Sequence, residues 1–283
     1  MNSALALGQN RVCSVRAGLG ERSQRVGVGV GSRSRGVSHS RIQALPDALL
    51  FDCDGVLVDT EKDGHRVAFN EAFKRKGLDH EWGVELYGEL LETGGGKERM
   101  TRYFSGCEDQ EPFKSTKTPE DRAAFVKELH LLKTDIFMEM VEAGSMPLRP
   151  GVKRLVGEAI EKGVTVAVCS TSNERAVSTI VKVLLGLEVA EVMPVYAGDI
   201  VPKKKPSPDI YQLAAKELGV DPEKCLVIED SKIGLQAAKA AGMKCFVTKS
   251  SYTTGENFES ADGIYDCIGD APNEQFSLKD APF

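Results

Sequence analysis

A short apolar run followed at once by two acidic residues constrains this chain more than any other stretch. Residues 48–51 (Ala-Leu-Leu-Phe) have the character of a buried strand, and Asp52, Asp54 and Gly55 come directly after it. Because residues two apart in a strand point to the same side, both carboxylates converge on one point. Two such charges raise one pKa or recruit a metal such as Mg2+, since an unpaired buried carboxylate costs several kcal/mol. Taken alone, an Asp-x-Asp-Gly turn after a core strand is an equally good interpretation.

The first 44 residues differ in composition from the rest of the chain. They contain seven Arg, seven Ser and seven Gly, with Glu21 as their one acidic residue and no Lys. Such an Arg- and Ser-rich, acid-poor start is typical of a disordered organellar transit peptide, whereas a secretory signal needs an apolar centre. A disordered basic tail is the alternative.

The remainder of the chain is acidic and has the composition of a protein with a hydrophobic core. Of 36 basic and 42 acidic residues, seven and one lie in the leader, which leaves 29 and 41 and a net charge of −12 for residues 45–283. This balance argues against a nucleic-acid partner, which selects a basic face. No apolar run reaches the roughly 18 residues of a membrane helix, and the seven Cys show neither CxxC nor Cys/His metal spacing. We expect a monomer that binds a small molecule rather than nucleic acid or a membrane.

Helical and strand patterns divide the rest of the chain into a core and an insert. Residues 63–146 carry only helical patterns and form the expected cap domain, whereas strands and helices alternate in the expected core, residues 45–62 and 147–283. Strands are expected over 48–51, 164–169, 192–197, 225–228, 245–248 and 263–265, and helices over 67–76, 83–91, 119–141, 152–161, 174–185, 208–218 and 232–241. The alternation predicts an α/β fold with a doubly wound, Rossmann-like parallel sheet. The polar tail from Ala271 is expected to be loose.

Polar residues follow the strands of this expected sheet. In open parallel sheets, ligands bind beyond the carboxyl ends of the strands. Those ends carry, in chain order, Asp52 and Asp54, then Ser170, Thr171, Ser172 and Asn173, then Lys205 in a loop rich in Lys and Pro, then Glu229 and Asp230. Four carboxylates exceed what one lysine neutralises, so a divalent cation is implied, and Mg2+ suits oxygen ligands with positions left for a phosphate. Alone, Glu229 and Asp230 are equally typical of a helix cap, and Lys203 and Lys204 of a solvated charge run.

A glycine-rich loop stands inside the helical insert. Residues 94–96 are all Gly and lead into a helix that carries Lys97 and Arg99 in its first turns. Backbone N–H groups at a helix start, together with two cations, favour a phosphate cradle. Glycines also simply interrupt helices, so this signal is weak by itself. Lys133, in the longest expected helix, is by itself interpreted as a solvated lysine.

Four motifs in chain order resemble those of the haloacid dehalogenase superfamily of phosphotransferases. They are Asp-x-Asp-Gly-Val-Leu-x-Asp-Thr (52–60), Cys-Ser-Thr-Ser (169–172), Lys-Pro-x-Pro-Asp (205–209) and Glu-Asp-Ser (229–231), within residues 46–270. The insert after the first motif resembles the subclass with a helical C1 cap. Segments 94–100, 148–152 and 197–206 and the leader resemble the plastid CbbY-like proteins. That family dephosphorylates xylulose 1,5-bisphosphate, an inhibitory by-product of Rubisco, and the resemblance implies the chloroplast stroma as the location.

The resemblance implies a role for each polar residue of the core. Asp52 is the expected nucleophile, which forms an aspartyl-phosphate, and Asp54 protonates the leaving sugar oxygen and then activates water. Mg2+ is expected on Asp52, on the backbone carbonyl of Asp54, and on Glu229 or Asp230. Phosphate and substrate contacts are expected from Ser170, Thr171, Ser172, Asn173 and Lys205.

The resemblance also assigns the choice of substrate to the cap. A bisphosphate presents a second anion about a sugar length from the first, and the expected receiving residues are Gly95, Gly96, Lys97, Arg99 and Lys133. Glu61 is expected to accept sugar hydroxyls, and His65 and Arg149 are further candidates nearby. Closure of the cap is expected to expel water and complete the site.

Two other functions compete with this interpretation. β-Phosphoglucomutase shares the fold, metal and nucleophile, but that family has a cap-side His ten residues after the second aspartate. Here that position is Gly64 and His65 is shifted by one, which favours hydrolysis. Another sugar-phosphate phosphatase of the superfamily and a metabolite-binding protein with a dead site are the remaining alternatives. The complete set of acidic, Ser and Lys residues speaks against the last, since nothing structural requires all of them together.

Overall fold

The computed structural model describes residues 44–283, so all but the last residue of the leader expected over residues 1–44 lies outside the described part. Within residues 44–283, no helix combines the length and apolar character needed to cross a bilayer.

The centre of the molecule is a parallel sheet of six strands in the order β3-β2-β1-β4-β5-β6. The strands are β1 (Ala48–Phe51), β2 (Thr165–Cys169), β3 (Val195–Tyr196), β4 (Cys225–Glu229), β5 (Lys244–Thr248) and β6 (Gly263–Tyr265). Strand β1 pairs with β2 on one side and with β4 on the other, and Phe51 lies opposite both Val168 and Ile228. The strand order reverses at β1, which is where open α/β sheets bind their ligands. The predicted fold class is confirmed.

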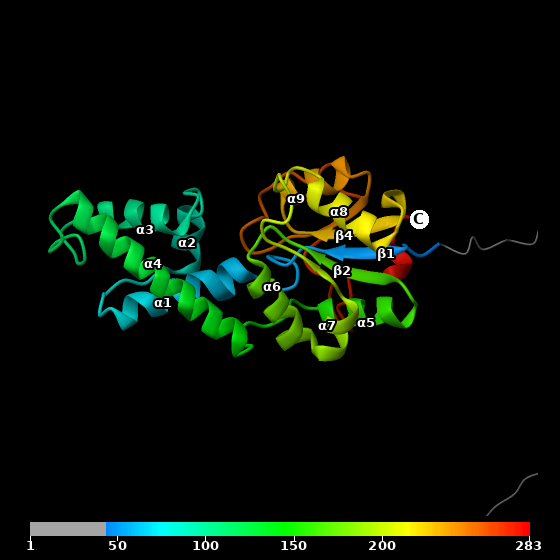
Figure 1. Ribbon diagram of the computed structural model, residues 1–283, viewed down its shortest axis with the longest axis horizontal. Coiled ribbons are helices and arrows are strands. Elements are labelled where there is room, and N and C mark those ends of the chain that lie inside the picture. The colour runs from blue at the N-terminus through cyan, green and yellow to red at the C-terminus, as the bar shows by residue number, and fades with distance from the viewer. Residues whose placement is uncertain (1–43) are drawn as a thin grey trace, which may run out of the picture. The chain divides into compact units, whose positions relative to one another are not determined.

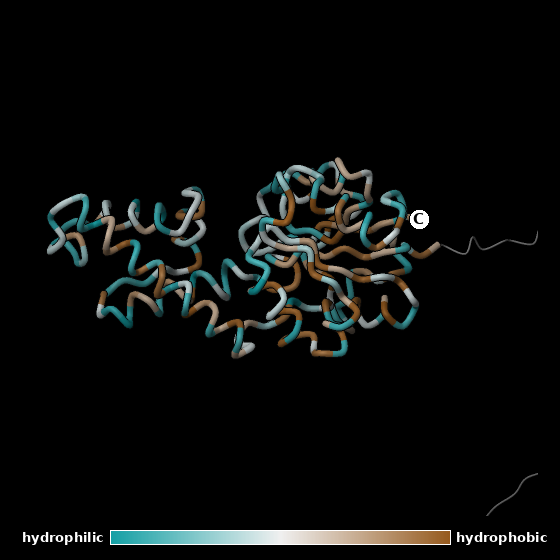
Figure 2. The backbone as a smooth tube through the Cα atoms, in the orientation of Figure 1, coloured by the Kyte–Doolittle hydropathy of each residue, from teal (hydrophilic) through white to brown (hydrophobic). Residues whose placement is uncertain are grey.

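Strand β1 contributes to two separate apolar cores because its residues alternate between the faces of the sheet. Ala48 and Leu50 pack with buried residues of α8 (Asp209–Leu218) and α9 (Lys232–Ala240). Leu49 and Phe51 face α5 (Val152–Glu161) and α6 (Glu174–Ile180). Figure 1 shows these two helical layers on opposite sides of the sheet, and Figure 2 shows the hydrophobic colour running along the strands. A strand buried on both faces gives the continuous apolar run seen in the sequence.

The insert between β1 and α5 is helical. It consists of the π-helical segment η1 (Thr60–His65) and helices α1 (Arg66–Arg75), α2 (Val84–Leu90), α3 (Gly96–Ser105) and α4 (Pro119–Glu142). Its core is aromatic: the Trp82 ring lies 4.7 Å from the Phe69 ring and 5.0 Å from the Phe73 ring, and all three side chains are buried. Helices α1 and α4 pack along each other (Figure 1), so the four helices form a layer of their own beside the sheet.

The structure differs from the sequence prediction around the edge strand. The strand expected over 192–197 is only the two residues of β3, and the unexpected helix α7 (Leu187–Val192) comes before it. The helix expected over 174–185 is α6, which continues as the wider turn η2 (Val181–Leu185). The apolar residues near 192 therefore belong to a helix that packs against η2 and do not lengthen the edge strand.

The expectation of a loose tail from Ala271 is wrong. Phe276 and Leu278 are buried, and the Phe276 ring lies 5.1 Å from that of Phe246 and 4.5 Å from that of Tyr265. The Arg154 guanidinium donates to the carbonyls of Gly269 and Phe276. The tail is polar in composition, but Phe276 and Leu278 are two residues apart and both side chains pack into the core.

Candidate active site

The Lys205 ammonium lies at the centre of the site, between two carboxylates. Its Nζ donates to Asp52 Oδ1 at 2.7 Å, to Glu229 Oε1 at 2.7 Å and to the Cys169 carbonyl at 2.9 Å. The Lys205 side chain is 5% exposed. Burial lowers the pKa of Lys205, but the charges of Asp52 and Glu229 outweigh it, so the pKa lies above its usual value. Lys205 therefore stays positively charged near neutral pH and links the ends of β1 and β4.

The Glu229 carboxylate is fully buried and receives donors on both oxygens. Oε1 also accepts from the Tyr211 hydroxyl at 2.7 Å, and Oε2 accepts from the Asp230 backbone N–H at 3.1 Å. Gly234 leaves room for this carboxylate, since a Cβ at that position would lie 1.9 Å from its Cδ atom. Glu229 thus holds Lys205 in place from behind the site.

The carboxylates at the ends of β1 and β4 fit a metal ion. Asp52, Glu229 and Asp230 each offer one oxygen, and these oxygens lie within 4.8 Å of one another. Burial raises the pKa of Asp52 well above its ordinary value; the Lys205 ammonium opposes this rise, and the charges of Glu229, Asp54 and Asp230 add to it. Burial, reinforced by Glu229, raises the pKa of Asp230 to about 7. One ammonium leaves an excess of negative charge here, which a divalent cation would neutralise.

Asp54 points to hydroxyl groups on its other side. Its Oδ1 accepts from the Thr60 hydroxyl at 2.6 Å, and its Oδ2 accepts from the Ser172 hydroxyl at 2.5 Å and the Ser170 hydroxyl at 3.3 Å. These donors fix the orientation of the carboxylate while leaving it in contact with the cavity. Asp54 therefore faces the cavity with both oxygens hydrogen-bonded, and it is not among the three carboxylates whose oxygens could share a metal ion.

Gly55 allows the chain to turn directly after Asp54, beside the residue that follows β4. Its φ is +76°, in the left-handed region that side chains rarely adopt, and a Cβ there would lie 2.0 Å from Asp230 Oδ2. The glycine is required both by the turn and by the close approach of Asp230.

On the cap side, Lys133 is buried and faces the site. Its Nζ lies 2.8 Å from His65 Nδ1 and 4.8 Å from the centre of the Phe69 ring. Burial lowers the pKa of Lys133 to about 8, with the Glu61 charge acting in the opposite direction. Burial and the nearby ammonium also lower the pKa of His65 well below its usual value, so His65 is a neutral acceptor. The interpretation of Lys133 as a solvated residue of α4 is wrong, because it shares the buried face with Leu129 and Phe137.

Tyr87 joins two further polar residues at the same wall. Its hydroxyl donates to Glu61 Oε2 at 2.6 Å and accepts from Arg99 Nη1 at 2.8 Å. Arg99 also donates to the Leu90 carbonyl at 3.2 Å and is buried. The chain Glu61, Tyr87, Arg99 therefore has a fixed geometry before any substrate arrives.

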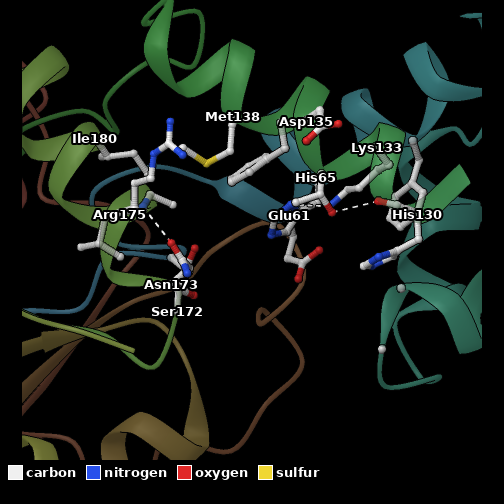
Figure 3. A pocket seen from close by; sticks show the side chains of 18 of the residues that line it. Glu61, His65, His130, Lys133, Asp135, Met138, Ser172, Asn173, Arg175 and Ile180 are labelled. Atoms are coloured by element: carbon white, nitrogen blue, oxygen red, sulfur yellow. Dashed lines mark hydrogen bonds between the residues drawn. The ribbon is translucent and has the colours of Figure 1, made fainter. Parts of the chain in front are cut away.

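Two adjoining cavities contain these groups. The catalytic cavity, about 400 Å³, is lined by Asp52, Asp54, Lys205 and Asp230 among others. The cap cavity, about 700 Å³, is lined by Gly95, Gly96, Arg99 and Lys133 among others. Asp54, Glu61, His65 and Ser172 line both. In Figure 3, Lys133 and His65 point toward each other on one wall of the cap cavity, and Ser172 and Asn173 lie across from them.

Comparisons with known proteins agree with this geometry. A sequence profile of haloacid dehalogenase-like hydrolases matches residues 46–242. The chain is 60% identical over 250 residues to a CBBY-like protein of Arabidopsis thaliana, covering 87% of this chain and 78% of that protein. The chain belongs to the haloacid dehalogenase-like hydrolase family. Within that family it is similar to the CbbY proteins, and the expectation that it is a phosphatase is confirmed.

Two solved structures of haloacid dehalogenase-like hydrolases are similar to this one. A mutant of CbbY from Rhodobacter sphaeroides in complex with xylulose-(1,5)bisphosphate is 40% identical, with a TM-score of 0.62, covering 80% of this chain and 96% of that chain. A putative β-phosphoglucomutase from Thermotoga maritima is 26% identical, with a TM-score of 0.59, covering 77% and 93%.

The structure gathers most of the predicted site residues of this hydrolase but places two of them, Arg149 and Lys97, elsewhere. Arg149 donates to the carbonyls of Gly55, Thr248, Lys249 and Asp266, so its guanidinium holds loops together and does not line either cavity. Lys97 is exposed and lines a separate surface hollow, because it follows Gly96 on the outer side of α3. Ser170 lies behind Asp54 and is 1% exposed, whereas Thr171 and Ser172 line the catalytic cavity and Asn173 the cap cavity. The structure therefore does not bring Arg149 and Lys97 to the walls of either cavity.

Several residues of the site were missed from the sequence. Thr60 ends the first motif and could have been found there, since it follows the aspartates at a short distance. Tyr211, Tyr87 and His130 come from helices whose apolar spacing marks them as core, and only the fold brings them to the site. No local signal distinguishes them from other buried residues.

Replacing Lys205 by Met should remove the charge that offsets Asp52 and Glu229. Breaking a buried ion pair by removing one partner costs about 3–5 kcal/mol of stability, and the loss of charge should lower phosphatase kcat/KM at least about 100-fold. Without the ammonium, the pKa of Asp52 rises further, so the folded state binds more protons than the unfolded state. The stability deficit should therefore be largest at pH 7.5 and shrink as the pH falls to 5.

Urea unfolding in chelator at both pH values tests this expectation. Lys204→Met is the matched control, since that neighbour is 55% exposed and pairs with Asp199, which is 90% exposed; its stability should stay within about 0.5 kcal/mol of wild type. A deficit in Lys205→Met that does not change with pH would contradict the pairing described here.

Proposed function

We propose that this hydrolase is an Mg2+-dependent phosphatase of sugar bisphosphates, and that its substrate is xylulose 1,5-bisphosphate, which it converts to xylulose 5-phosphate. The observation that carries the proposal is the pair of adjoining cavities. One is built for phosphoryl transfer, and the other holds two buried cations, Arg99 and Lys133. The Glu61 carboxylate offsets only part of this buried positive charge, which favours an anionic ligand in the cap cavity. The CbbY mutant that is 40% identical to this chain was solved with xylulose-(1,5)bisphosphate, which supports the choice of sugar.

In the catalytic cavity, Asp52 attacks the phosphorus and forms an aspartyl-phosphate while the bond from phosphorus to the sugar oxygen breaks. Asp54 in its acid form gives its proton to that oxygen and then takes a proton from the water that attacks the aspartyl-phosphate. Water attack releases inorganic phosphate and restores Asp52. Lys205 stabilises the charge on the transferring phosphoryl oxygens from one side.

Mg2+ would be held by Asp52, the backbone carbonyl of Asp54, and Asp230. When bound, it would neutralise charge on the phosphoryl oxygens and align the phosphate with the nucleophile. We favour Asp230 over Glu229 as the side-chain ligand, because both Glu229 oxygens already accept hydrogen bonds from the protein. Asp230 lines the catalytic cavity instead.

In the cap cavity, the second phosphate would lie against Arg99, Lys133 and the backbone at Gly95 and Gly96, which opens α3. Glu61 lines both cavities, so it would accept hydroxyl groups of the sugar that spans them. The distance between the two phosphate positions would then determine how long a bisphosphate can bind in both cavities at once.

The packing around Gly64 supports hydrolysis over mutase chemistry. A Cβ at Gly64 would lie 2.6 Å from Met146 Sδ and 2.8 Å from a ring carbon of Phe137, so no histidine fits at this position. His65 does not replace it, because its ring lies 4.2 Å from that of Phe137 and its Nδ1 faces Lys133.

Assays on the purified full-length chain with Mg2+ test the proposal. We expect phosphate release from xylulose 1,5-bisphosphate with a kcat/KM about 10 to 100 times that for sugar monophosphates, since a charged hydrogen-bonded group contributes about 1.5–3 kcal/mol. Asp52→Asn, which keeps the shape of the side chain, should abolish release, as should a chelator. Conversion of β-glucose 1-phosphate to glucose 6-phosphate at a higher kcat/KM would overturn the choice of reaction, and release that survives Asp52→Asn would refute the covalent route.

The pKa of Lys133, about 8, predicts the pH dependence of substrate binding. Below pH 8 the residue is an ammonium ion and attracts the second phosphate, and above pH 8 the free enzyme loses this charge. We expect KM for the bisphosphate to be flat below pH 8 and to rise by up to about tenfold per pH unit above it. Lys133→Met should raise KM at pH 7 and remove this rise.

Lys97→Met is the control for that measurement, because Lys97 is a lysine of the same domain that lies outside both cavities. Its KM profile should match that of the wild type. An unchanged profile in Lys133→Met would show that the second phosphate lies elsewhere.

We further propose that residues 1–44 direct the protein to the chloroplast stroma. The support is the Arg- and Ser-rich, acid-poor composition of this segment and the 60% identity to a plant protein. A fusion of residues 1–44 to green fluorescent protein should enter isolated chloroplasts, and a fusion of residues 45–283 should not. Entry into mitochondria instead would overturn the proposal.

A further inference from the structure

The loop after β5 touches the cap at a point close to Glu61. Strand β5 ends at Thr248, and the Arg149 guanidinium holds the following chain by the Thr248 and Lys249 carbonyls. The loop then closes on itself, since the Ser250 N–H donates to the Thr253 hydroxyl at 2.9 Å. Ser251 and Tyr252 stand at the tip of this closed turn. Their position is thus set by the core, although both contact the insert or its first residues.

Ser251 binds Asp59, the residue that caps the start of η1. Its hydroxyl donates to Asp59 Oδ2 at 2.5 Å, and its backbone N–H donates to the same oxygen at 3.2 Å. The other oxygen of Asp59 accepts from the Lys62 N–H at 3.3 Å and so caps η1. Glu61 lies within that first turn. Ser251 therefore fixes the backbone from which Glu61 projects.

Tyr252 contacts the cap residue that holds the Glu61 side chain. Its hydroxyl donates to the Val84 carbonyl at 3.2 Å, at the start of α2, and its ring lies 5.8 Å from that of Tyr87. Gly88 leaves space for the ring, since a Cβ there would lie 3.2 Å from two Tyr252 carbons. Tyr87 in turn donates to Glu61 Oε2 at 2.6 Å. This one loop thus contacts both neighbours of Glu61: Asp59, which caps its helical turn, and Tyr87, which bonds to its carboxylate.

We propose that Ser251 and Tyr252 are positioning residues for Glu61, and that they determine selection of the sugar without contacting its phosphates. Tyr252 lines the catalytic cavity, but its hydroxyl is committed to Val84 and its ring packs against Tyr87. Its effect on the substrate therefore passes through Tyr87 and Glu61. The inference rests on the proposed function only in that the substrate carries hydroxyl groups beside the transferred phosphate.

The test compares a sugar phosphate with p-nitrophenyl phosphate, which has no sugar hydroxyls for Glu61 to bind. In the full-length chain, Tyr252→Ala should lower kcat/KM for xylulose 1,5-bisphosphate about 10 to 100-fold, mainly through KM, and change that for p-nitrophenyl phosphate less than about twofold. Tyr252→Phe keeps the ring against Tyr87 and should restore most of the activity. Ser251→Ala should act in the same direction but less, since its backbone bond to Asp59 remains. Thr254→Ala, an exposed residue of the same loop, is the control and should match wild type.

A double-mutant cycle shows whether Tyr252 acts through Glu61. The combined variant Glu61→Gln, Tyr252→Ala should lose little more than Glu61→Gln alone, because the carboxylate that Tyr252 positions is already gone. Losses that multiply, or equal losses with both substrates, would overturn the inference. If the wild type prefers another sugar phosphate, the proposed substrate fails, and the same cycle on that preferred substrate still decides the role of Tyr252. If no sugar phosphate is hydrolysed, both proposals fail.

Discussion

A single ammonium group between two buried carboxylates sets the arrangement of the whole site. Lys205 touches Asp52 at the end of β1 and Glu229 at the end of β4, and its positive charge offsets part of the cost of burying these two carboxylates. The lysine cannot neutralise Asp54 and Asp230 as well, so the surplus negative charge makes the site receptive to a divalent cation, whose own charge would then favour a phosphate. The cost of burying the carboxylates is thus linked directly to ligand binding.

The parallel sheet is what brings these charges together. Strand β1 lies between β2 and β4, and the order reverses there, so groups from 153 residues apart along the chain can bond directly. Two glycines make the convergence sterically possible: Gly55 admits Asp230, and Gly234 admits Glu229. Helix α8, on one face of the sheet, contributes Tyr211 to the same network, so part of the geometry of the site is determined by core packing.

The sequence predicts the site residues that follow strands, but it does not predict those that helix packing brings to the site. Asp52, Asp54, Glu229 and Asp230 could be placed near one another because each follows an apolar run. Lys133 could not, since the sequence around a lysine on an apolar helix face does not tell whether another element covers it. Here Phe137 of the same helix and Phe69 of α1 surround its ammonium. Arg149 was misplaced for the reverse reason. A cation near the motif looked like a ligand group, but the carbonyls it binds belong to loops that meet only in three dimensions.

Glu61 lies where the core and the cap meet, and groups from both hold it in place. The residue lies in η1, where the core leads into the helical insert. Its helical turn is capped by Asp59, which is held by Ser251 of the core, and its side chain is held by Tyr87 of the cap. In the proposed reaction, the groups that transfer the phosphoryl group all come from the core, whereas the sugar would be recognised by cap and core together. Because Glu61 is held by both the core and the cap, a displacement of either would move its carboxylate relative to Asp54 of the core or to Arg99 and Lys133 of the cap. In the proposed function, a substrate that bridges the two cavities would therefore contact cap and core together, whereas a short phosphate ester would contact the catalytic cavity alone.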